Sequence, residues 1–251
     1  RKKYSGMVSD VLVMNELKEL LRKQRLTRGC LDFDLPEPEM ILDIQGGIES
    51  IIKRSRLDAH MLIEEFMIAA NETVAEFMFN RKSPCIYRIH EEPDQDVIIQ
   101  FNQLAHNLGF PIKYSKEIHP KIYSELLDRV KNTPSDKVVN AALLRSMKQA
   151  VYSAENRGHF GLASTCYTHY TSPIRRYPDL IIHRLLKKEL KKEKKAADRD
   201  VEEVSAGLAE QAAHCSKQER IVEEAEREFV ALKKAQFMAD KVGKQFTGYI
   251  S

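Results

Sequence analysis

The sequence has few of the residues that interrupt or cross-link a chain. Its 251 residues include only 10 glycines, 9 prolines and 4 cysteines. A chain this poor in glycine and proline is neither collagen-like nor of low complexity, and 43% hydrophobic residues exclude a disordered chain. The cysteines lie far apart and form no Cys-x-x-Cys pair. They indicate buried thiols in a reducing cytoplasm, and neither a disulfide framework nor a zinc site.

Long apolar runs are also absent. The longest runs hold only a few residues, whereas a membrane-spanning helix needs roughly 20. The chain starts at Arg1 with neither a methionine nor a charged and then apolar leader. We therefore expect no secretion signal and no membrane partner, and Arg1 need not be a natural terminus. These features predict a cytoplasmic protein.

The net charge is small. Forty lysines and arginines against 37 aspartates and glutamates give a charge of +3, which by itself does not indicate nucleic-acid binding. Any electrostatic argument must therefore be local. One basic run, residues 184–195, could follow RNA phosphates. A solvated helix end, where cations are favoured by the helix dipole, is the alternative.

Hydrophobic periodicity predicts a mainly helical α+β fold with a small antiparallel β portion. Helices are expected over residues 7–26, 57–80, 93–108, 122–130, 137–152, 178–195, 201–214 and 217–240. Strands are expected over residues 30–35, 40–44 and 48–53, as a small meander, and over residues 84–90 and 158–167. Gly29 is expected to end the first helix, and Asp94 and Ser135 are expected to cap two others.

The densest chemistry lies in residues 158–184, around two adjacent arginines. Arg175 and Arg176 stand between Pro173 and Pro178, which cannot both belong to one undistorted helix interior. Their guanidinium groups are therefore expected near a bend, close to the start of a helix. Guanidinium and backbone N–H groups at such a place suit a phosphate. Two arginines held in structural ion pairs fit the pattern equally well.

Longer motifs narrow the interpretation. Residues 158–162 are Gly-His-Phe-Gly-Leu, and residues 172–177 are Ser-Pro-Ile-Arg-Arg-Tyr. Other words accompany them in order: Leu-Asp-Phe at 31–33, Ala-His-Met-Leu-Ile-Glu-Glu at 59–65, Arg-Ser-Met-Lys-Gln-Ala-Val-Tyr at 145–152, His-Cys-Ser at 214–216 and Ala-Glu-Arg at 225–227. Together they resemble the catalytic RNB domain of the ribonuclease II and ribonuclease R family of 3′-to-5′ exoribonucleases. The resemblance covers essentially the whole chain and favours the ribonuclease R branch.

The resemblance implies roles for three residues at the reacting phosphate. Arg175 matches an arginine that holds the scissile phosphate near the 3′ end, and Arg176 beside it is expected to bind RNA. Glu226, in Ala-Glu-Arg, matches a glutamate near the catalytic centre. From the residues alone, Glu226 belongs to an acidic run whose simplest interpretation is a solvated helix face.

Three more residues match RNA-binding positions. Glu64 and Tyr4 match a pair that reads the ribose 2′-hydroxyl, the group that distinguishes RNA from DNA. Phe33 matches a ring that clamps the terminal bases, and base stacking on a ring is worth about 1 to 3 kcal/mol per base. Phe33 could equally be a core residue, and Tyr4 lies close to the end of the chain. Since Glu64 and Glu65 point about 100° apart on a helix, at least one should face solvent or a partner.

The resemblance also implies catalysis with two divalent ions of the Mg²⁺ type, which need clustered carboxylates. The family supplies them from an Asp-x-Asp-Asp-Ala motif that precedes the part matching Arg1, and the motif is absent from this sequence. Asp-x-Asp pairs occur at 32/34, 94/96 and 198/200. A strand edge, a helix cap and a linker explain them more simply. We therefore expect no metal ligands in this chain.

The expected organisation follows from the resemblance. Residues 1–242 would form a partial catalytic domain that lacks its N-terminal half, and residues 243–251 would begin an OB-type barrel. The intact enzyme would bind single-stranded RNA and release nucleoside 5′-monophosphates processively with Mg²⁺. This chain would supply the RNA clamp and the phosphate-gripping arginine. A natural non-catalytic RNA-binding or assembly subunit of the same fold is the alternative, and the oligomeric state stays open.

Overall fold

The computed structural model describes residues 2–33, 38–45, 47–53, 56–112, 119–191, 199–239 and 241–246. It confirms the predicted fold class, because helices dominate these residues and their two sheets are antiparallel pairs. The α-helices are α1 (Val8–Arg28), α2 (Asp58–Asn80), α3 (Gln95–Asn107), α4 (Pro120–Val130), α5 (Asp136–Ser146), α6 (Tyr177–Lys191) and α7 (Arg199–Ala239). The strands are β1 (Pro38–Leu42), β2 (Ile48–Lys53), β3 (Tyr87–Ile89) and β4 (Val151–Ser153), and two 3-10 helices are η1 (Lys2–Met7) and η2 (Phe160–Leu162).

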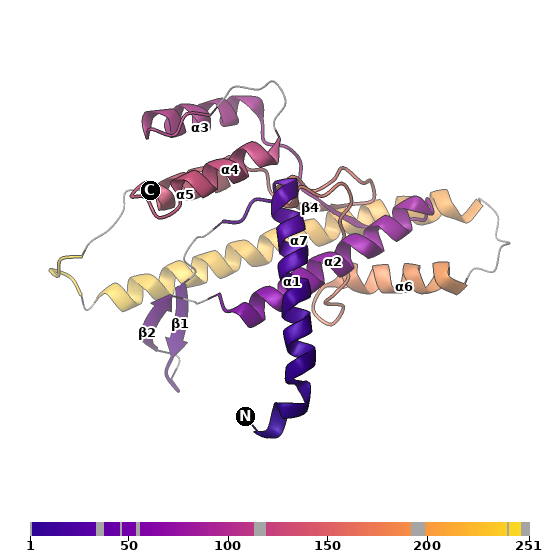
Figure 1. Ribbon diagram of the computed structural model, residues 1–251, viewed down its shortest axis with the longest axis horizontal. Helices are drawn as coiled ribbons and strands as arrows, with labels where there is room; N and C mark the ends of the chain where they lie inside the picture. Colours follow the sequence, from indigo (N-terminus) through magenta and orange to yellow (C-terminus); the bar gives the residue numbers. More distant parts are fainter. Residues whose placement is uncertain are drawn as a thin grey trace.

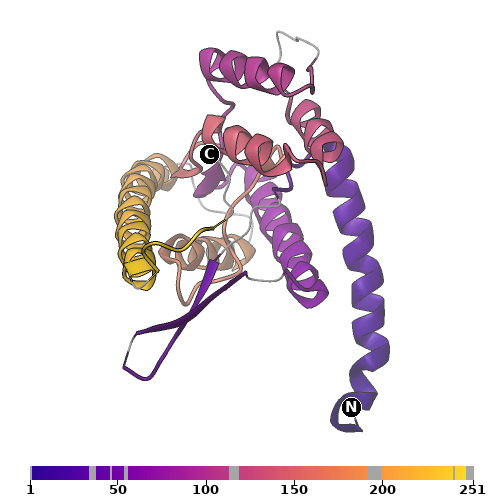
Figure 2. The same cartoon turned by 90° about the vertical axis from the view of Figure 1, so that its left-hand side faces the viewer.

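The helices are arranged in two tiers. The helices α3, α4 and α5 lie together above α2, α6 and the long α7 (Figure 1). The N-terminal half of α1 extends away from this body, and the β1–β2 hairpin projects on the same side, as the second view also shows (Figure 2). Helix α1 packs on α2 and touches α4 near its C-terminal end.

The end of α1 is fixed by a glycine, as predicted. Gly29 adopts a left-handed conformation with φ of 100°, and its N–H donates to the carbonyl of Leu26 at 2.9 Å. A Cβ atom at this position would lie 2.6 Å from the backbone of Lys121 in α4. Gly29 therefore both ends the helix and permits the close approach of α4.

Two hydrophobic clusters hold the body together. The first joins α2, β3, β4, α6 and α7, and its buried side chains include Met78, Ile86 and Ile182. The second joins α3, α4 and α5, and it contains Leu126 and Leu143. Each such side chain contributes about 1.5–3 kcal/mol when fully buried. Residues 160–166 link the clusters, because the phenylalanine at one end belongs to the second and the cysteine at the other end to the first.

The predicted three-stranded meander is wrong, because the described residues of this region form only two strands. Strand β1 pairs antiparallel with β2, from Pro38 opposite Lys53 to Leu42 opposite Ile48. Residues 30–33 form no strand. The N–H of Leu31 instead donates to the carbonyl of Gly161, at 2.8 Å. Residues 34–37 lie outside the described residues.

Two other predicted elements take a different form. The helix expected over residues 137–152 ends at Ser146, and the residues that follow form β4, opposite β3. Residues 158–167 form η2 and isolated bridges rather than a strand, because His159 pairs with both His90 and Ser164. Asp94 and Ser135 precede α3 and α5 as predicted, but neither side chain makes a capping hydrogen bond.

The two helices predicted near the C-terminus are one continuous helix, α7. No glycine or proline interrupts residues 214–217, and the hydroxyl of Ser216 donates within the helix to the carbonyl of Ala212, at 2.9 Å. Residues 243–246 are turn and coil, while residues 247–251 of the predicted barrel strand and residues 192–195 of the predicted basic helix lie outside the described residues. The domain boundary at residue 242 stays a prediction.

Candidate functional site

A tight turn at residues 172–176 leads into α6 and presents Arg175. The backbone N–H groups of Arg175 and Arg176 donate to the carbonyl of Ser172, at 3.2 and 3.0 Å. Asp179, in the first turn of α6, is 0% exposed. Its Oδ1 accepts from the N–H of Ser172 at 2.7 Å and from the guanidinium of Arg176 at 2.8 and 3.2 Å. One buried carboxylate therefore fixes the turn, at a helix end where the dipole also favours it.

The structure distinguishes the two arginines of this turn. Arg176 is mostly buried, and its guanidinium is bound to Asp179, as expected of a structural arginine. Arg175 is exposed, and its side chain makes no hydrogen bond or ion pair with the residues that the structure describes. Arg175 is thus the member of the pair whose guanidinium can form a bidentate contact with a phosphate.

Replacing Asp179 by asparagine is expected to lower the free energy of unfolding by about 1–3 kcal/mol, because hydrogen bonds to a charged buried group are lost or weakened. Urea unfolding followed by circular dichroism measures the change. The matched control is Asp96→Asn, which alters an exposed carboxylate in the first turn of α3 and should cost less than about 1 kcal/mol. Equal losses in the two variants would show that Asp179 does not organise the turn.

His169, three positions before the turn, belongs to a group of aromatic rings. The Tyr152 hydroxyl and His169 Nδ1 are 2.8 Å apart, and the Arg88 guanidinium lies over the Tyr152 ring, 4.6 Å from its centroid. Burial, followed by the charges of Arg176 and Arg88, lowers the pKa of His169 to about 2. The charge of Arg175 acts in the same direction. The His169 ring is therefore neutral at neutral pH and lies within electrostatic range of the exposed arginine.

One face of α7 closes this group from the other side. Ser216 Oγ accepts from the N–H of Tyr152 at 2.9 Å, Glu219 pairs with Arg88 at 2.5 Å, and Glu223 accepts from the Gln149 side chain at 2.7 Å. Glu226 is exposed and follows on the same helical face, since residues 219, 223 and 226 are spaced by four and three positions. The acidic run is thus not uniformly solvated, because two of these three carboxylates contact β3 and the segment before β4.

Glu64 and Glu65 differ as helical geometry predicts. The side chain of Glu65 is 2% exposed and accepts from Arg25 at 2.5 and 3.1 Å. The side chain of Glu64 is 37% exposed and accepts from the guanidinium of Arg56 at 2.7 Å. A ribose hydroxyl would therefore have to share or displace Arg56 to reach the Glu64 carboxylate.

Tyr4 lies far from Glu64 in this structure. Tyr4 is in η1, before the start of α1, and is 60% exposed. Glu64 lies beside Arg25, near the other end of α1. The helix between Val8 and Arg25, 17 positions apart, spans about 25 Å. The structure does not bring the predicted pair together.

The sequence allowed Phe33 to be either a core residue or a ring available to a base, and its position in the structure has features of both. It is partly buried against the cluster of α3, α4 and α5. It also lines a cavity of about 220 Å³ between α1, α4 and α5, with Arg22, Asp32, Arg56 and Lys131 among the other lining residues. Arg22 and Arg56 both bind the Asp32 carboxylate, and these hydrogen bonds lower its pKa against the opposing effect of burial.

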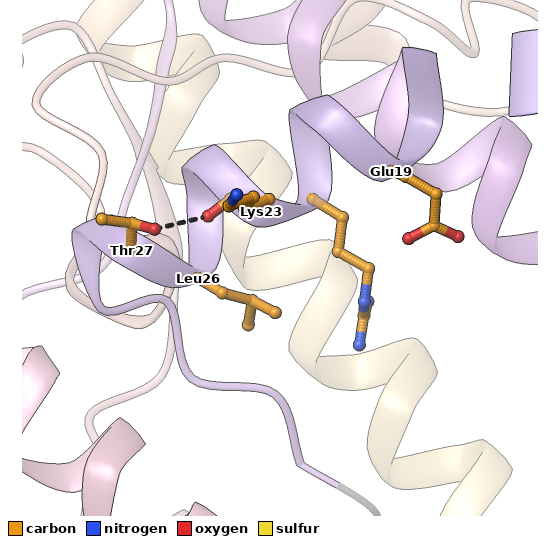
Figure 3. Close-up of a pocket in the computed structure, with 5 residues that line it drawn as sticks. Glu19, Lys23, Leu26 and Thr27 are labelled. Atoms are coloured by element: carbon orange, nitrogen blue, oxygen red, sulfur yellow. Dashed lines mark hydrogen bonds between the residues drawn. The ribbon is translucent and has the colours of Figure 1, made fainter. Parts of the chain in front are cut away.

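Another hollow, of about 400 Å³, lies along α1, and the described residues that line it all belong to that helix (Figure 3). The hydroxyl of Thr27 donates to the carbonyl of Lys23 there, at 2.8 Å. Arg22 also lines the cavity of Phe33. None of the six predicted site residues lines this second hollow.

The carboxylates do not fit a Mg²⁺ site. Within the described residues no group of three or more His, Cys, Asp or Glu side chains could hold a metal ion. Asp32 is bound by two arginines, and Asp94 pairs with Lys148 at 2.8 Å. Asp34, Asp198 and the side chain of Asp200 lie outside the described residues. We therefore derive no step through a metal ion held by these residues.

Four residues of the site were not singled out from the sequence: Arg88, Tyr152, His169 and Asp179. Asp179 could have been identified from the sequence, because an aspartate just inside a helix start is favoured by the helix dipole and can bind the preceding turn. The contacts of the other three join segments up to 131 residues apart, for which no local pattern exists.

Comparison with solved structures places this fold among ribonucleases of the R type. The chain superposes on "Mycoplasma genitalium RNase R in complex with ribose methylated single-stranded RNA" with a TM-score of 0.91 and 28% identity, over 97% of this chain and 38% of that one.

No helix of the described residues is both long and apolar enough to cross a membrane.

Comparison with curated sequences also finds ribonucleases of the R type. The chain is 47% identical to ribonuclease R of Thermotoga maritima over 92% of its length, and 42% identical to ribonuclease R of Aquifex aeolicus over 100% of its length. It covers 33% and 35% of those proteins, so it spans about a third of the length of these curated relatives. The RNB domain model matches residues 1–192. The chain belongs to the RNB domain family.

Proposed function

We propose that this chain is part of a 3′-to-5′ exoribonuclease that hydrolyses single-stranded RNA processively to nucleoside 5′-monophosphates. The observation that carries the proposal is the exposed Arg175, presented by a turn that the buried Asp179 fixes. The family membership and the RNA-bound relative of similar fold support it. In this proposal Arg175 binds the scissile phosphate through its guanidinium fork.

The other predicted site residues, except Arg176, keep their proposed roles around this phosphate. Glu226 lies on the face of α7 that contacts Arg88 and Gln149, which is consistent with a place near the catalytic centre. Phe33 lines a cavity and so can offer its ring to a base. Glu64 would read a ribose hydroxyl together with Arg56, while the role of Tyr4 requires that η1 or α1 take another position. Arg176 would act on RNA indirectly, by holding the turn.

Mg²⁺ is the proposed cofactor of the intact enzyme. The described residues offer no carboxylate cluster for it, so its ligands are proposed to lie outside this chain. The ions would activate the attacking water and stabilise the leaving oxygen. This chain would bind and orient the RNA.

Replacing Arg175 by alanine is expected to weaken binding of a fluorescein-labelled oligoadenylate about tenfold or more, because a charge-assisted contact with the phosphate is lost. Fluorescence anisotropy at a series of salt concentrations, without metal, measures the affinity. Lys191→Ala is the matched control, since it removes an exposed cation at the far end of α6. Equal losses from the two substitutions would mean that binding is nonspecific charge attraction and would count against the proposed site.

A non-catalytic RNA-binding or assembly subunit of the same fold is the second candidate. The described residues hold no metal-binding cluster, which this candidate requires and which the exonuclease explains by ligands outside the chain. Single-turnover digestion of 3′-labelled RNA with Mg²⁺ by the natural protein that contains this sequence separates the two. Release of mononucleotides supports the exonuclease, and binding without release supports the second candidate.

A further inference from the structure

His169 has a ring nitrogen that no other described residue contacts by a hydrogen bond. Its Nδ1 is bound to the Tyr152 hydroxyl at 2.8 Å, and its ring lies edge-on to both Tyr152 and Tyr167, at centroid distances of 5.6 and 5.8 Å. The ring is only partly buried. Among the described residues no group hydrogen-bonds its Nε2. Two tyrosines thus hold the ring in one orientation, and one of its polar atoms is available to a ligand.

Two other histidines, His90 and His183, differ in this respect. His90 Nε2 donates to the carbonyl of Lys148 at 2.7 Å, and His183 Nε2 donates to the carbonyl of Tyr170 at 2.9 Å. Both of these rings use Nε2 to hold the fold. His169 does not, although it is held by its other nitrogen as firmly as they are.

The surroundings of His169 are positively charged. Arg88, Arg175 and Arg176 all act on the ring, and together with burial they keep it neutral. A neutral ring whose Nδ1 accepts from the Tyr152 hydroxyl carries its hydrogen on Nε2. A phosphate oxygen can only accept a hydrogen bond, so a phosphate near Arg175 would favour this tautomer.

We propose that His169 is a second ligand of the RNA phosphate that Arg175 binds: Arg175 supplies the charge, and His169 donates its Nε2–H to a phosphate oxygen. Tyr152 acts through His169 as a positioning residue that fixes the tautomer and the direction of the ring. The inference rests on the proposed function, because it needs a nucleic-acid phosphate at Arg175.

Substituting His169 by glutamine or by asparagine tests the two ring nitrogens separately. A glutamine at 169 can place a donor near the position of Nε2, whereas an asparagine reaches only the position of Nδ1. Binding of a fluorescein-labelled oligoadenylate is measured by anisotropy over a salt series at neutral pH without metal. We expect His169→Asn and His169→Ala to weaken binding about tenfold, and His169→Gln to stay within about twofold of the unmodified chain.

The dependence on salt provides the second readout. Since His169 is neutral, its variants should leave the slope of log affinity against log salt unchanged, whereas Arg175→Ala should reduce the slope by about 0.7. His106→Ala, an exposed histidine of α3, is the matched control and should change neither quantity. If His169→Ala does not fold, as thermal unfolding would show, the comparison of Gln with Asn still decides.

Two results would overturn the inference. Wild-type affinity of His169→Asn, or equal weakening by Gln and Asn, would show that Nε2 donates nothing to the phosphate, even where Arg175→Ala still weakens binding. If Arg175→Ala has no effect, the proposed function fails and the role of His169 fails with it.

Discussion

Glu65→Ala is expected to lower the free energy of unfolding by about 3–5 kcal/mol, because it removes the hydrogen-bonded counter-charge of a buried guanidinium and leaves only the more distant Glu64, at 3.7 Å. Arg25 and Glu65 join α1 to α2 through two hydrogen bonds, at 2.5 and 3.1 Å, and both side chains are almost fully buried. Burial opposes the charge of Arg25, but the hydrogen bond and charge of Glu65 raise its pKa above the usual value. Urea unfolding followed by circular dichroism measures the loss.

Glu64→Ala is the matched control for this stability measurement. It removes the neighbouring carboxylate, which is more than a third exposed and paired with Arg56, so the expected loss is below about 1 kcal/mol. A double variant, Arg25→Leu with Glu65→Leu, should recover much of the stability that Glu65→Ala loses, since no uncompensated charge stays buried. Similar losses for the two alanine variants would contradict the assigned difference between these carboxylates.

Hydrophobic periodicity and end signals predicted most helices of this fold. The end of α1 at Gly29 and the extent of α2 follow from local sequence, because a helix records its own buried face every three or four residues. The difference between Glu64 and Glu65 was predictable for the same reason. The single helix α7 was not, because the polar residues near Ser216 resemble a break, and the hydroxyl satisfies itself within the helix.

Local sequence patterns could not predict the structure of segments that are held by residues distant in the sequence. Residues 158–167 have the composition of a strand, yet the N–H of Phe160 donates to the carbonyl of His90 at 2.8 Å and the N–H of Arg88 donates to the carbonyl of Tyr167 at 2.9 Å. These contacts bind the segment to β3 one residue at a time and prevent a continuous ladder. The same holds for Leu31, whose partner lies 130 positions further along the chain.

The candidate site was predictable in part. The two prolines indicated the bend, and the resemblance indicated Arg175, but neither showed which arginine of the pair is exposed. That outcome depends on Asp179, which binds Arg176 because the two are three positions apart at the start of α6. The contact between Tyr152 and His169 depends on β4 lying beside the segment that precedes the turn, which is a property of the tertiary fold.

Acid is expected to destabilise the protein in a range where few carboxylates titrate. Burial, with the charges of neighbouring His90 and Arg88, lowers the pKa of His159 to about 3, and burial with Arg176 and Arg88 lowers that of His169 to about 2. In the unfolded chain both would have a pKa near 6.5. At pH values between the folded and the unfolded pKa, the unfolded state therefore binds more protons than the folded state. The free energy of unfolding consequently falls as pH falls below about 6.5.

The expected loss between about pH 7 and about pH 5 is about 4 kcal/mol for the two histidines together, at up to about 1.4 kcal/mol per pH unit for each. Asp32 does not contribute in this range, because its lowered pKa places its effect below the usual aspartate value of 3.8. Urea unfolding at several pH values measures the slope.

The variant His159→Asn keeps an acceptor for the N–H of Leu162 but cannot titrate, so it should lose about half of the pH dependence. A stability that stays constant from about pH 7 to about pH 5 would mean that these rings are protonated as readily in the folded protein as in the unfolded chain.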